Sequence, residues 1–267
     1  RFSINYTKQD GSIGEYVGTL KRYNNKMRSW RRKTHDEATL LKFYERFSDS
    51  QNFPIFLLRM PHKEFFIRDY IPGVTYEKVN QDFYHKGGDI DYKLEKAADH
   101  RERERLLQRK CILEKNQGLV LDVIVGALAR VHHIGTSNLE FLRKVNLTGY
   151  RIRNPGIKYY EEDFTKCIMS LLKSKINIDE QKDELKMKLA RMFYSSRISR
   201  YLEKQNDLIL GDAHSRNIVI ASNDCTDNVE DIYEYPSLET KMASLKERIF
   251  FTDVGRGKVG AATNDLV

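Results

Sequence analysis

Two acids and one amide stand beside short apolar runs in the last quarter of the sequence. Asp212 follows one apolar run, and Asn217 comes five positions later, directly before the next apolar run. About forty residues on, Asp253 follows a third such run. Carboxylate and amide oxygens are hard ligands that hold Mg²⁺ together with phosphate oxygens, and a further acid can orient an attacking hydroxyl. The pattern therefore predicts phosphoryl transfer, with strand ends fixing the three side chains.

The stretch 208–220 resembles a motif of the aminoglycoside phosphotransferase and choline kinase-like superfamily, which reads roughly His-Gly-Asp-x-His-x-x-Asn. Here the residues are Leu-Gly-Asp-Ala-His-Ser-Arg-Asn. The stretch 249–255, which ends in Asp-Val-Gly, is similar to the strand that carries the metal aspartate in that family. The resemblance implies that Asp212 is the catalytic base and that Asn217 and Asp253 bind Mg²⁺. An ordinary polar turn is the alternative.

The match to the family departs from its pattern in two places. Leu210 stands where the family has its first histidine, which usually braces the neighbouring backbone. The glycine-rich phosphate loop of the family is indistinct here, and only residues 10–14, Asp-Gly-Ser-Ile-Gly, could correspond to it. His214 matches a histidine that is frequent in the family, and we assign it to packing of the loop rather than to catalysis.

Lys21 lies in a strand-like stretch from Tyr16 to Tyr23. The resemblance implies that this lysine grips the α- and β-phosphates of ATP and that Glu37, on the helix that follows, is its ion-pair partner. A surface lysine on a strand is the alternative for Lys21. Arg22 competes with Lys21 for the phosphate-binding role, and Asp36 and Glu45 compete with Glu37 for the role of ion-pair partner.

The stretch 67–73, Ile-Arg-Asp-Tyr-Ile-Pro-Gly, looks like the hinge between the two lobes of such enzymes. The resemblance implies that backbone groups near Asp69, Tyr70 and Ile71 pair with the adenine edge. A plain edge strand followed by a turn is the alternative.

The elements before Gly73 predict a small lobe of strands with one helix. Residues 1–27 alternate and contain turn residues, which indicates a hairpin or meander. Residues 34–47 carry an apolar stripe, and Thr34 with Glu37 forms a capping-box pattern at the start of the predicted helix. Two further strands are expected over residues 53–58 and 65–71.

The remainder of the chain is predicted to be mostly helical. Residues 93–133 favour helix with a break near 116–118, and amphipathic helices are expected over 160–175 and 179–204. In the last of these, four apolar residues are expected to share one face: Leu185, Leu189, Met192 and Phe193. Segment 221–247 is rich in turn residues and reads as an irregular insertion.

The fold class is therefore α+β, and the resemblance implies a two-lobed protein kinase-like fold. Residues 1–73 form the nucleotide-binding lobe, an antiparallel sheet with one helix, and residues 74–267 form a larger, mostly helical lobe. The stretch 128–133 resembles the end of the family's long core helix, where one histidine packs against the catalytic loop. About 80 residues separate His133 from Asp212, and the resemblance implies that residues 137–204 form a helical insertion that binds the acceptor.

The composition of the chain limits the classes of partner that it is expected to bind. The chain has 267 residues, a net charge of +8 and a pI near 9.2. This charge favours anionic partners such as nucleotide phosphates, and admits a nucleic acid or an anionic surface, whereas a polycationic acceptor is disfavoured. In the predicted insertion, five arginines are candidates for the acceptor site, with solvated helix faces as the alternative: Arg151, Arg153, Arg191, Arg197 and Arg200.

The cysteines and the apolar runs of the sequence indicate where in the cell the protein is expected. Cys111, Cys167 and Cys225 show neither metal spacing nor a disulfide framework, which indicates a reducing cytoplasm. No apolar run approaches the roughly 20 residues of a membrane span, so we expect no transmembrane segment.

The sequence thus predicts a kinase that moves the γ-phosphoryl group of ATP to a hydroxyl of a small, anionic or neutral molecule, with Mg²⁺ as cofactor. A protein kinase or other macromolecular kinase is one alternative. A nucleotide-binding pseudokinase that acts through a partner is the other.

Overall fold

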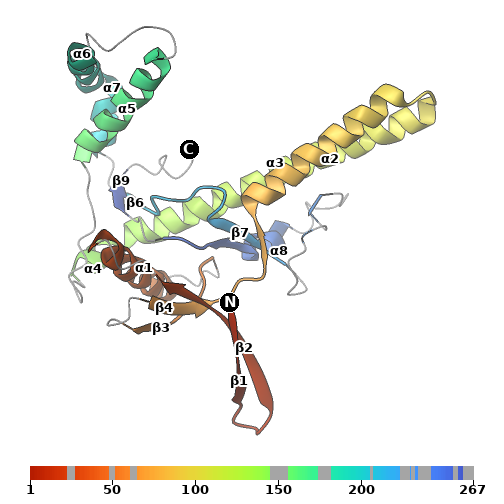
Figure 1. Cartoon of the computed structure of the whole chain (residues 1–267), viewed down its shortest axis with the longest axis horizontal. Helices are drawn as coiled ribbons and strands as arrows, with labels where there is room; N and C mark the ends of the chain where they lie inside the picture. The colour runs from red at the N-terminus through yellow and green to blue at the C-terminus, as the bar shows by residue number, and fades with distance from the viewer. Residues whose placement is uncertain are drawn as a thin grey trace.

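The structure is a computed structural model. It describes residues 1–22, 28–47, 52–60, 65–144, 156–173, 182–204, 207–222, 229, 232–233, 242–254 and 258–260. A small sheet with one helix, a larger and mostly helical part, and a long projecting pair of helices make up the molecule (Figure 1). The expected α+β class and the division into a sheet-containing lobe and a helical lobe are confirmed.

The first lobe is built on a four-stranded antiparallel sheet of order β1-β2-β4-β3. Its strands are β1 (Phe2–Thr7), β2 (Ile13–Arg22), β3 (Phe56–Met60) and β4 (Phe65–Asp69). The hairpin expected at the start of the chain is present, with Thr7 opposite Ile13 at its closed end. Residues 10–14 therefore lie at the tip of the hairpin, and Ile13 is about 27 Å along β2 from Lys21 at a rise of about 3.4 Å per residue. This glycine-containing stretch is thus far along the strand from Lys21.

The helix of this lobe, α1 (Arg28–Phe47), begins six residues earlier than expected. Thr34 and Glu37 therefore lie inside the helix, and the predicted capping box is wrong. The basic residues from Arg28 to Lys33 are good helix formers and extend the helix towards its N-terminus. Glu37 instead belongs to the buried face of α1, where its neighbours are apolar: Ala38, Leu40, Leu41, Phe43 and Tyr44.

The second lobe begins with a short strand that joins another sheet. β5 (Gly73–Thr75) pairs with β7 (Ile218–Ala221), which pairs with β8 (Ile249–Phe251). Gly73 has a φ of 155°, and a Cβ there would meet the carbonyl oxygen of Ile220 at 2.2 Å. Only glycine fits at this crossing from one lobe to the other.

Two long helices follow, α2 (Tyr76–Lys96) and α3 (His100–Ser137). The break expected near residues 116–118 is wrong, because α3 is continuous there and the chain turns instead at residues 97–99, where Asp99 caps α3. The side chain of Asn116 is buried, and its Nδ2 donates to the carbonyl oxygen of Tyr233 at 3.2 Å. A polar residue inside a helix thus finds its partner on another segment rather than ending the helix.

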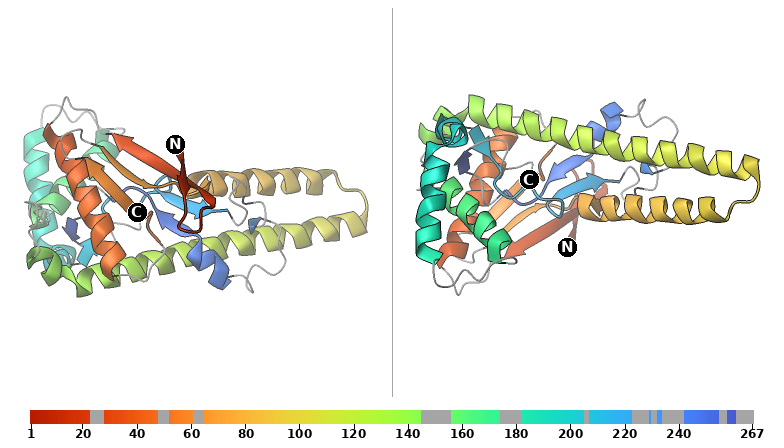
Figure 2. Two further views of the ribbon diagram at one scale, coloured as in Figure 1. Left: turned by 90° about the horizontal axis from the view of Figure 1, so that it is seen from below. Right: turned by 90° about the horizontal axis from the view of Figure 1, so that it is seen from above.

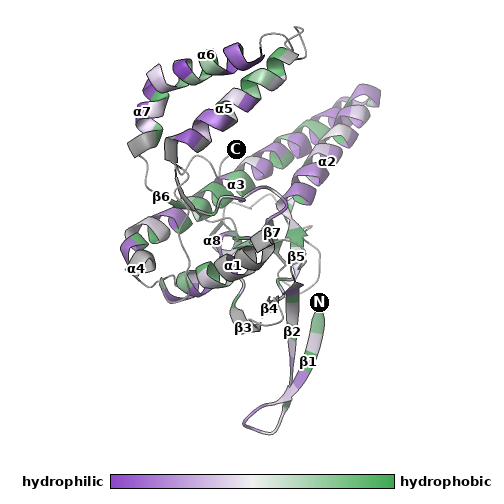
Figure 3. Cartoon of the chain, turned by 60° about the vertical axis from the view of Figure 1, so that its left-hand side comes forward, coloured by the Kyte–Doolittle hydropathy of each residue, from purple (hydrophilic) through white to green (hydrophobic). Residues whose placement is uncertain are grey.

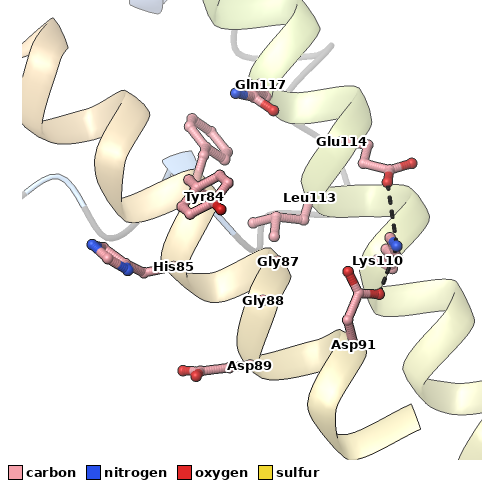
Figure 4. A pocket seen from close by; sticks show the side chains of 11 residues that line it. Tyr84, His85, Gly87, Gly88, Asp89, Asp91, Lys110, Leu113, Glu114 and Gln117 are labelled. Atoms are coloured by element: carbon pink, nitrogen blue, oxygen red, sulfur yellow. Dashed lines mark hydrogen bonds and ion pairs between the residues drawn. The ribbon is translucent and has the colours of Figure 1, made fainter. Parts of the chain in front are cut away.

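The α2–α3 pair projects well beyond the sheets (Figure 2). Lys110 of α3 joins the helices through Asp91 of α2 at 2.6 Å and lies 4.0 Å from Glu114. Beside this contact, a pocket of about 440 Å³ opens where Gly87 and Gly88 leave room between the helices (Figure 4). None of the candidate site residues lines it.

Most of the main hydrophobic core is organised around the inner part of α3. Val120, Val123 and Leu128 are buried there, and apolar residues gather along this part of the helix in Figure 3. By length and composition α3 is also apolar enough to cross a membrane, which corrects the expectation that no stretch comes close. The buried residues of α3 belong to the main core.

Three helices between residues 156 and 204 have a small core of their own. They are α5 (Gly156–Lys173), α6 (Lys182–Ser195) and α7 (Arg197–Lys204), and they follow the short helix α4 (Leu139–Lys144). Met169 and Leu189 are buried between α5 and α6, with Leu185 packed against them, and Phe193 is buried as well. Met192 is 61% exposed, so its expected place on the shared face is wrong.

The remaining elements complete the second lobe. β6 (Asp207–Ile209) pairs with β9 (Lys258–Gly260), and α8 (Met242–Glu247) precedes β8. Within the predicted irregular insertion, Val229, Ile232, Tyr233 and Leu245 are buried. Part of this segment therefore belongs to the core.

Candidate active site

The loop that carries Asp212 leaves β6 through two buried leucines, Leu208 and Leu210. Leu210 is 1% exposed, so the residue that replaces the family's histidine packs in the apolar core. Gly211 follows with a φ of 73°, a left-handed conformation that favours glycine. This turn brings the partly exposed Asp212 out of the core.

Hydrogen bonds within the loop bring Asn217 against Asp212. The Nδ2 of Asn217 donates to the carbonyl oxygen of Asp212 at 2.8 Å, and its backbone N–H donates to the carbonyl oxygen of His214 at 2.8 Å. Because the amide nitrogen is used inside the loop, the side-chain oxygen of Asn217 is the atom that can bind a metal.

His214 packs against the same two residues, as expected from its assignment to the loop. Its Nε2 lies 3.2 Å from Asn217 Nδ2 and 3.7 Å from Asp212 Oδ1. Its Nδ1 accepts the backbone N–H of Arg216 at 3.2 Å. His214 therefore fixes the turn on the side next to the Asp212 carboxylate.

The start of α2 anchors this loop, a contact that the sequence did not indicate. The backbone N–H of Glu77 donates to the carbonyl oxygen of Ser215 at 3.1 Å. The Nε of Arg216 lies 2.8 and 2.9 Å from the two carboxylate oxygens of Glu77. The start of α2, which follows β5, is thus tied directly to the loop that holds Asp212.

The end of β8 lies beside the end of the same loop. Thr252 donates to the carbonyl oxygen of Asn217 through its backbone N–H at 2.9 Å and through its hydroxyl at 3.2 Å. Asp253 comes next and is partly exposed. The antiparallel pairing of β7 and β8, with Ile218 opposite Phe251, therefore brings Asn217 and Asp253 to one edge of the sheet.

Lys21 connects this edge to the first lobe. Its Nζ lies 2.7 Å from Glu37 Oε2 and 3.2 Å from Asp253 Oδ2. Glu37 is fully buried, and burial raises the pKa of its carboxyl group, opposed by the positive charges of Lys21 and Arg68. Of the residues that compete with Lys21 and Glu37, Glu45 is exposed, and the side chains of Arg22 and Asp36 lie outside the described residues.

The chain has a two-lobed α+β fold. Lys21 lies against both Glu37 of α1 and Asp253 after β8, at a point between the lobes. The resemblance implied its pairing with Glu37, whereas its contact with Asp253 was not predicted.

Arg68 on β4 also belongs to this cluster and was missed from the sequence. Its Nη1 lies 3.4 Å from Glu37 Oε1 and donates to the carbonyl oxygen of Thr252. The alternation of β4 was a usable signal, because it places Arg68 on the face opposite to that of its neighbours Ile67 and Asp69.

The predicted hinge residues follow β4 directly. Asp69 donates its backbone N–H to Ile55 at 3.0 Å, and Tyr70 donates to Val17 at 3.2 Å. The edge of an adenine base would therefore have to form its hydrogen bonds with the other backbone groups of this segment, including those of Ile71. Burial and the nearby Asp69 carboxylate raise the pKa of Tyr16, whose side chain borders the same segment.

The two histidines at the end of α3 differ in burial. His132 is buried and His133 is exposed. Four residues after His132, the hydroxyl oxygen of Thr136 accepts a hydrogen bond from the backbone N–H of Leu208 at 3.1 Å. Helix α3 therefore contacts the strand that leads into the Asp212 loop.

The arginines proposed for an acceptor site are only partly described. Arg191 on α6 and Arg197 and Arg200 on α7 are exposed. Arg151 and Arg153 lie outside the described residues.

The donor set fits magnesium. Asp253 supplies a partly exposed carboxylate, and Asn217 supplies an amide oxygen from the adjacent loop. Among the described residues no group of three or more histidine, cysteine or acidic side chains is suited to hold a metal. A site with few protein ligands suits Mg²⁺, which is usually bound by one or two carboxylates together with phosphates and water.

No protein-family model matches the sequence, and no curated protein matches it. Two solved structures are similar. The gentamicin-APH(2")-IIa complex matches over 98% of this chain and 64% of that chain, with 17% identity and a TM-score of 0.47. The streptomycin-ATP-APH(2")-IIa ternary complex matches over 99% of this chain and 69% of that chain, with 18% identity and a TM-score of 0.47. The chain spans less than two thirds of the length of the first of these.

Proposed function

We propose that this protein is a Mg²⁺-dependent phosphotransferase that moves the γ-phosphoryl group of ATP to a hydroxyl of a small molecule. The observation that supports it most directly is the position of Lys21 Nζ, which lies 2.7 Å from Glu37 and 3.2 Å from Asp253. This contact joins the candidate phosphate-binding pair to the candidate metal carboxylate.

Each residue has a distinct part in the proposed reaction. Lys21, oriented by Glu37, binds the α- and β-phosphates. Asp253 and the side-chain oxygen of Asn217 hold Mg²⁺, which would neutralise charge on the phosphates and keep them in line for transfer. Asp212 accepts a hydrogen bond from the acceptor hydroxyl and takes its proton as the oxygen attacks the γ-phosphorus, while the bond from this phosphorus to the β–γ bridging oxygen breaks and ADP leaves with that oxygen.

The loop of Asp212 is preorganised for this task. Its backbone is held by Asn217, and its far end is held by Glu77 through Ser215 and Arg216. Because the transition state of phosphoryl transfer is loose, a fixed position of the acceptor hydroxyl matters more than the basicity of Asp212.

The acceptor is proposed to bind against residues 137–204. A net charge of +8 suits an anionic or neutral acceptor. Exposed arginines on α6 and α7 supply donors for charge-assisted hydrogen bonds.

A screen of ATP consumption tests the proposal. Purified protein is incubated with ATP and Mg²⁺ and with pools of sugars, amino alcohols, nucleosides and anionic metabolites. We expect one pool to stimulate ATP consumption, and Asp212→Asn to abolish the stimulation. Asp122→Asn, an exposed aspartate on α3, is the matched control and is expected to behave as wild type. Stimulation by protein substrates alone, with none from small molecules, would indicate a macromolecular kinase instead.

A further inference from the structure

Arg68 occupies an unusual place for a charged side chain. In the pairing of β2 with β4, Lys21 lies opposite Phe66 and Thr19 lies opposite Arg68. Because directly opposed residues share a face and alternate residues of a strand do as well, Arg68 emerges on the same face as Lys21. The side chain of Arg68 is only 12% exposed, so its charge must be paired within the protein.

Its partners belong to both halves of the candidate site. Nη1 of Arg68 lies 3.4 Å from Glu37 Oε1, while the other carboxylate oxygen of Glu37 holds Lys21 at 2.7 Å. Nη1 of Arg68 also donates to the carbonyl oxygen of Thr252, the residue before Asp253. Arg68 therefore links the carboxylate that orients Lys21 to the backbone that carries Asp253.

Thr252 is consequently held from two sides. Its N–H and hydroxyl donate to the carbonyl oxygen of Asn217, and its own carbonyl accepts from Arg68. The peptide that precedes Asp253 is thus fixed by the loop of the second lobe and by a side chain of the first lobe.

We propose that Arg68 is a positioning residue that keeps the Lys21–Glu37 pair and the Asp253 carboxylate in one arrangement for Mg²⁺ and nucleotide phosphates; this inference rests on the proposed function. Mg²⁺ at Asp253 competes with Lys21 for the same carboxylate, so the Lys21–Asp253 contact cannot by itself hold the two lobes in register during binding. The contacts of Arg68 involve neither the phosphates nor the metal and persist through that exchange.

The guanidinium group is suited to this link. Its Nη1 carries two N–H groups in a fixed plane, and the contacts to Glu37 and to the carbonyl oxygen of Thr252 both come from this atom. A lysine at this position retains the charge, but its compact ammonium group lacks the planar arrangement that fixes the directions of the two contacts. Arg68→Lys should therefore keep part of the function and Arg68→Met should keep none of it.

The test measures the Mg²⁺ requirement of nucleotide binding, which does not depend on the acceptor. The melting temperature is recorded with a fixed concentration of ATP and increasing Mg²⁺ for wild type, Arg68→Met, Arg68→Lys and the control Arg103→Met. Arg103 is an exposed arginine on α3. We expect Arg68→Met to need about tenfold more Mg²⁺ or beyond for its half-maximal shift, as for other outer-sphere partners of metal ligands. Arg68→Lys should lie between, and Arg103→Met should match wild type.

Other outcomes separate this inference from the proposed function. A wild-type protein with no Mg²⁺-dependent shift in ATP contradicts the proposed function itself. If Arg68→Met shows the same Mg²⁺-dependent shift as wild type at the same Mg²⁺ concentrations, Arg68 is merely structural and the inference is overturned. This conclusion holds even if the melting temperature of Arg68→Met is lower throughout. If Arg68→Met does not fold, Arg68→Lys decides, and a wild-type Mg²⁺ requirement in that variant overturns the inference equally.

Discussion

The Nζ atom of Lys21 lies 3.2 Å from Oδ2 of Asp253, so the candidate phosphate-binding lysine forms an ion pair with the candidate metal carboxylate. Both side chains are partly exposed, at 20% and 35%. A magnesium ion that binds Asp253 therefore competes with Lys21, and nucleotide phosphates offer Lys21 a replacement partner. Metal and nucleotide are expected to bind cooperatively, because each makes the exchange easier for the other.

The first prediction follows from this exchange. ATP with Mg²⁺ should raise the melting temperature, since a ligand at 100 times its Kd that binds only the folded state adds about 2.7 kcal/mol of stability. Asp253→Asn should remove most of the Mg²⁺-dependent part of this rise, because the anionic ligand is lost. Differential scanning fluorimetry with and without EDTA measures both parts, and Asp122→Asn is the matched control. An undiminished Mg²⁺ effect in Asp253→Asn would exclude Asp253 as the metal ligand.

The second prediction separates chemistry from binding. Asp212→Asn keeps the shape of the side chain and removes its charge, so we expect kcat to fall by about 100-fold or more. The affinity for ATP with Mg²⁺ should change little, because the lost interaction is made with the reacting hydroxyl in the transition state. Steady-state kinetics and nucleotide titration on the same preparation measure the two effects. Parallel losses of affinity and turnover would instead make Asp212 a metal ligand or a structural residue.

Much of the candidate site could be predicted from the sequence because its residues stand at the ends of apolar strands. Asp212, Asn217 and Asp253 each adjoin such a run, and the pairing of β7 with β8 brings the last two together. Lys21 and Glu37 were identified through the resemblance, and their 2.7 Å contact agrees with it.

The missed features depend on contacts between distant segments. Arg68 acts through Thr252, which lies 184 residues away in the chain, and Asn116 is satisfied by Tyr233, 117 residues away. Local patterns of helix propensity and capping contain no information on such partners. For the same reason the break expected in the long helix was wrong, whereas the capping box was wrong because local helix formers extend α1 by six residues.

The third prediction concerns the pH dependence of stability. Burial raises the pKa of Glu37 above its ordinary value of 4.5. Since the folded state then binds the proton more tightly than the unfolded state, the contribution of Glu37 to the free energy of unfolding is greatest below pH 4.5 and falls as pH rises through its raised pKa. The difference in free energy of unfolding between wild type and Glu37→Gln should follow this course.

Urea unfolding from pH 4.5 upwards measures that difference. The matched control is Glu45→Gln, which removes the carboxylate of an exposed glutamate on the same helix. A difference for Glu37→Gln that grows in favour of wild type as pH rises would mean that Lys21 and Arg68 outweigh burial.

The fourth prediction concerns the acceptor. Arg197 on α7 is exposed, and a charge-assisted hydrogen bond from it to an anionic acceptor would contribute about 1.5–3 kcal/mol. With the acceptor found by the screen, Arg197→Ala should therefore raise the acceptor KM by about tenfold or more and leave the KM of ATP unchanged. Arg103→Ala is the matched control, because Arg103 is an exposed arginine on α3. Steady-state kinetics with each substrate varied in turn measures both constants. If gentamicin, a polycation, were phosphorylated rapidly and Arg197→Ala had no effect on it, the acceptor would be cationic and the basic face of α7 would be a solvated helix surface.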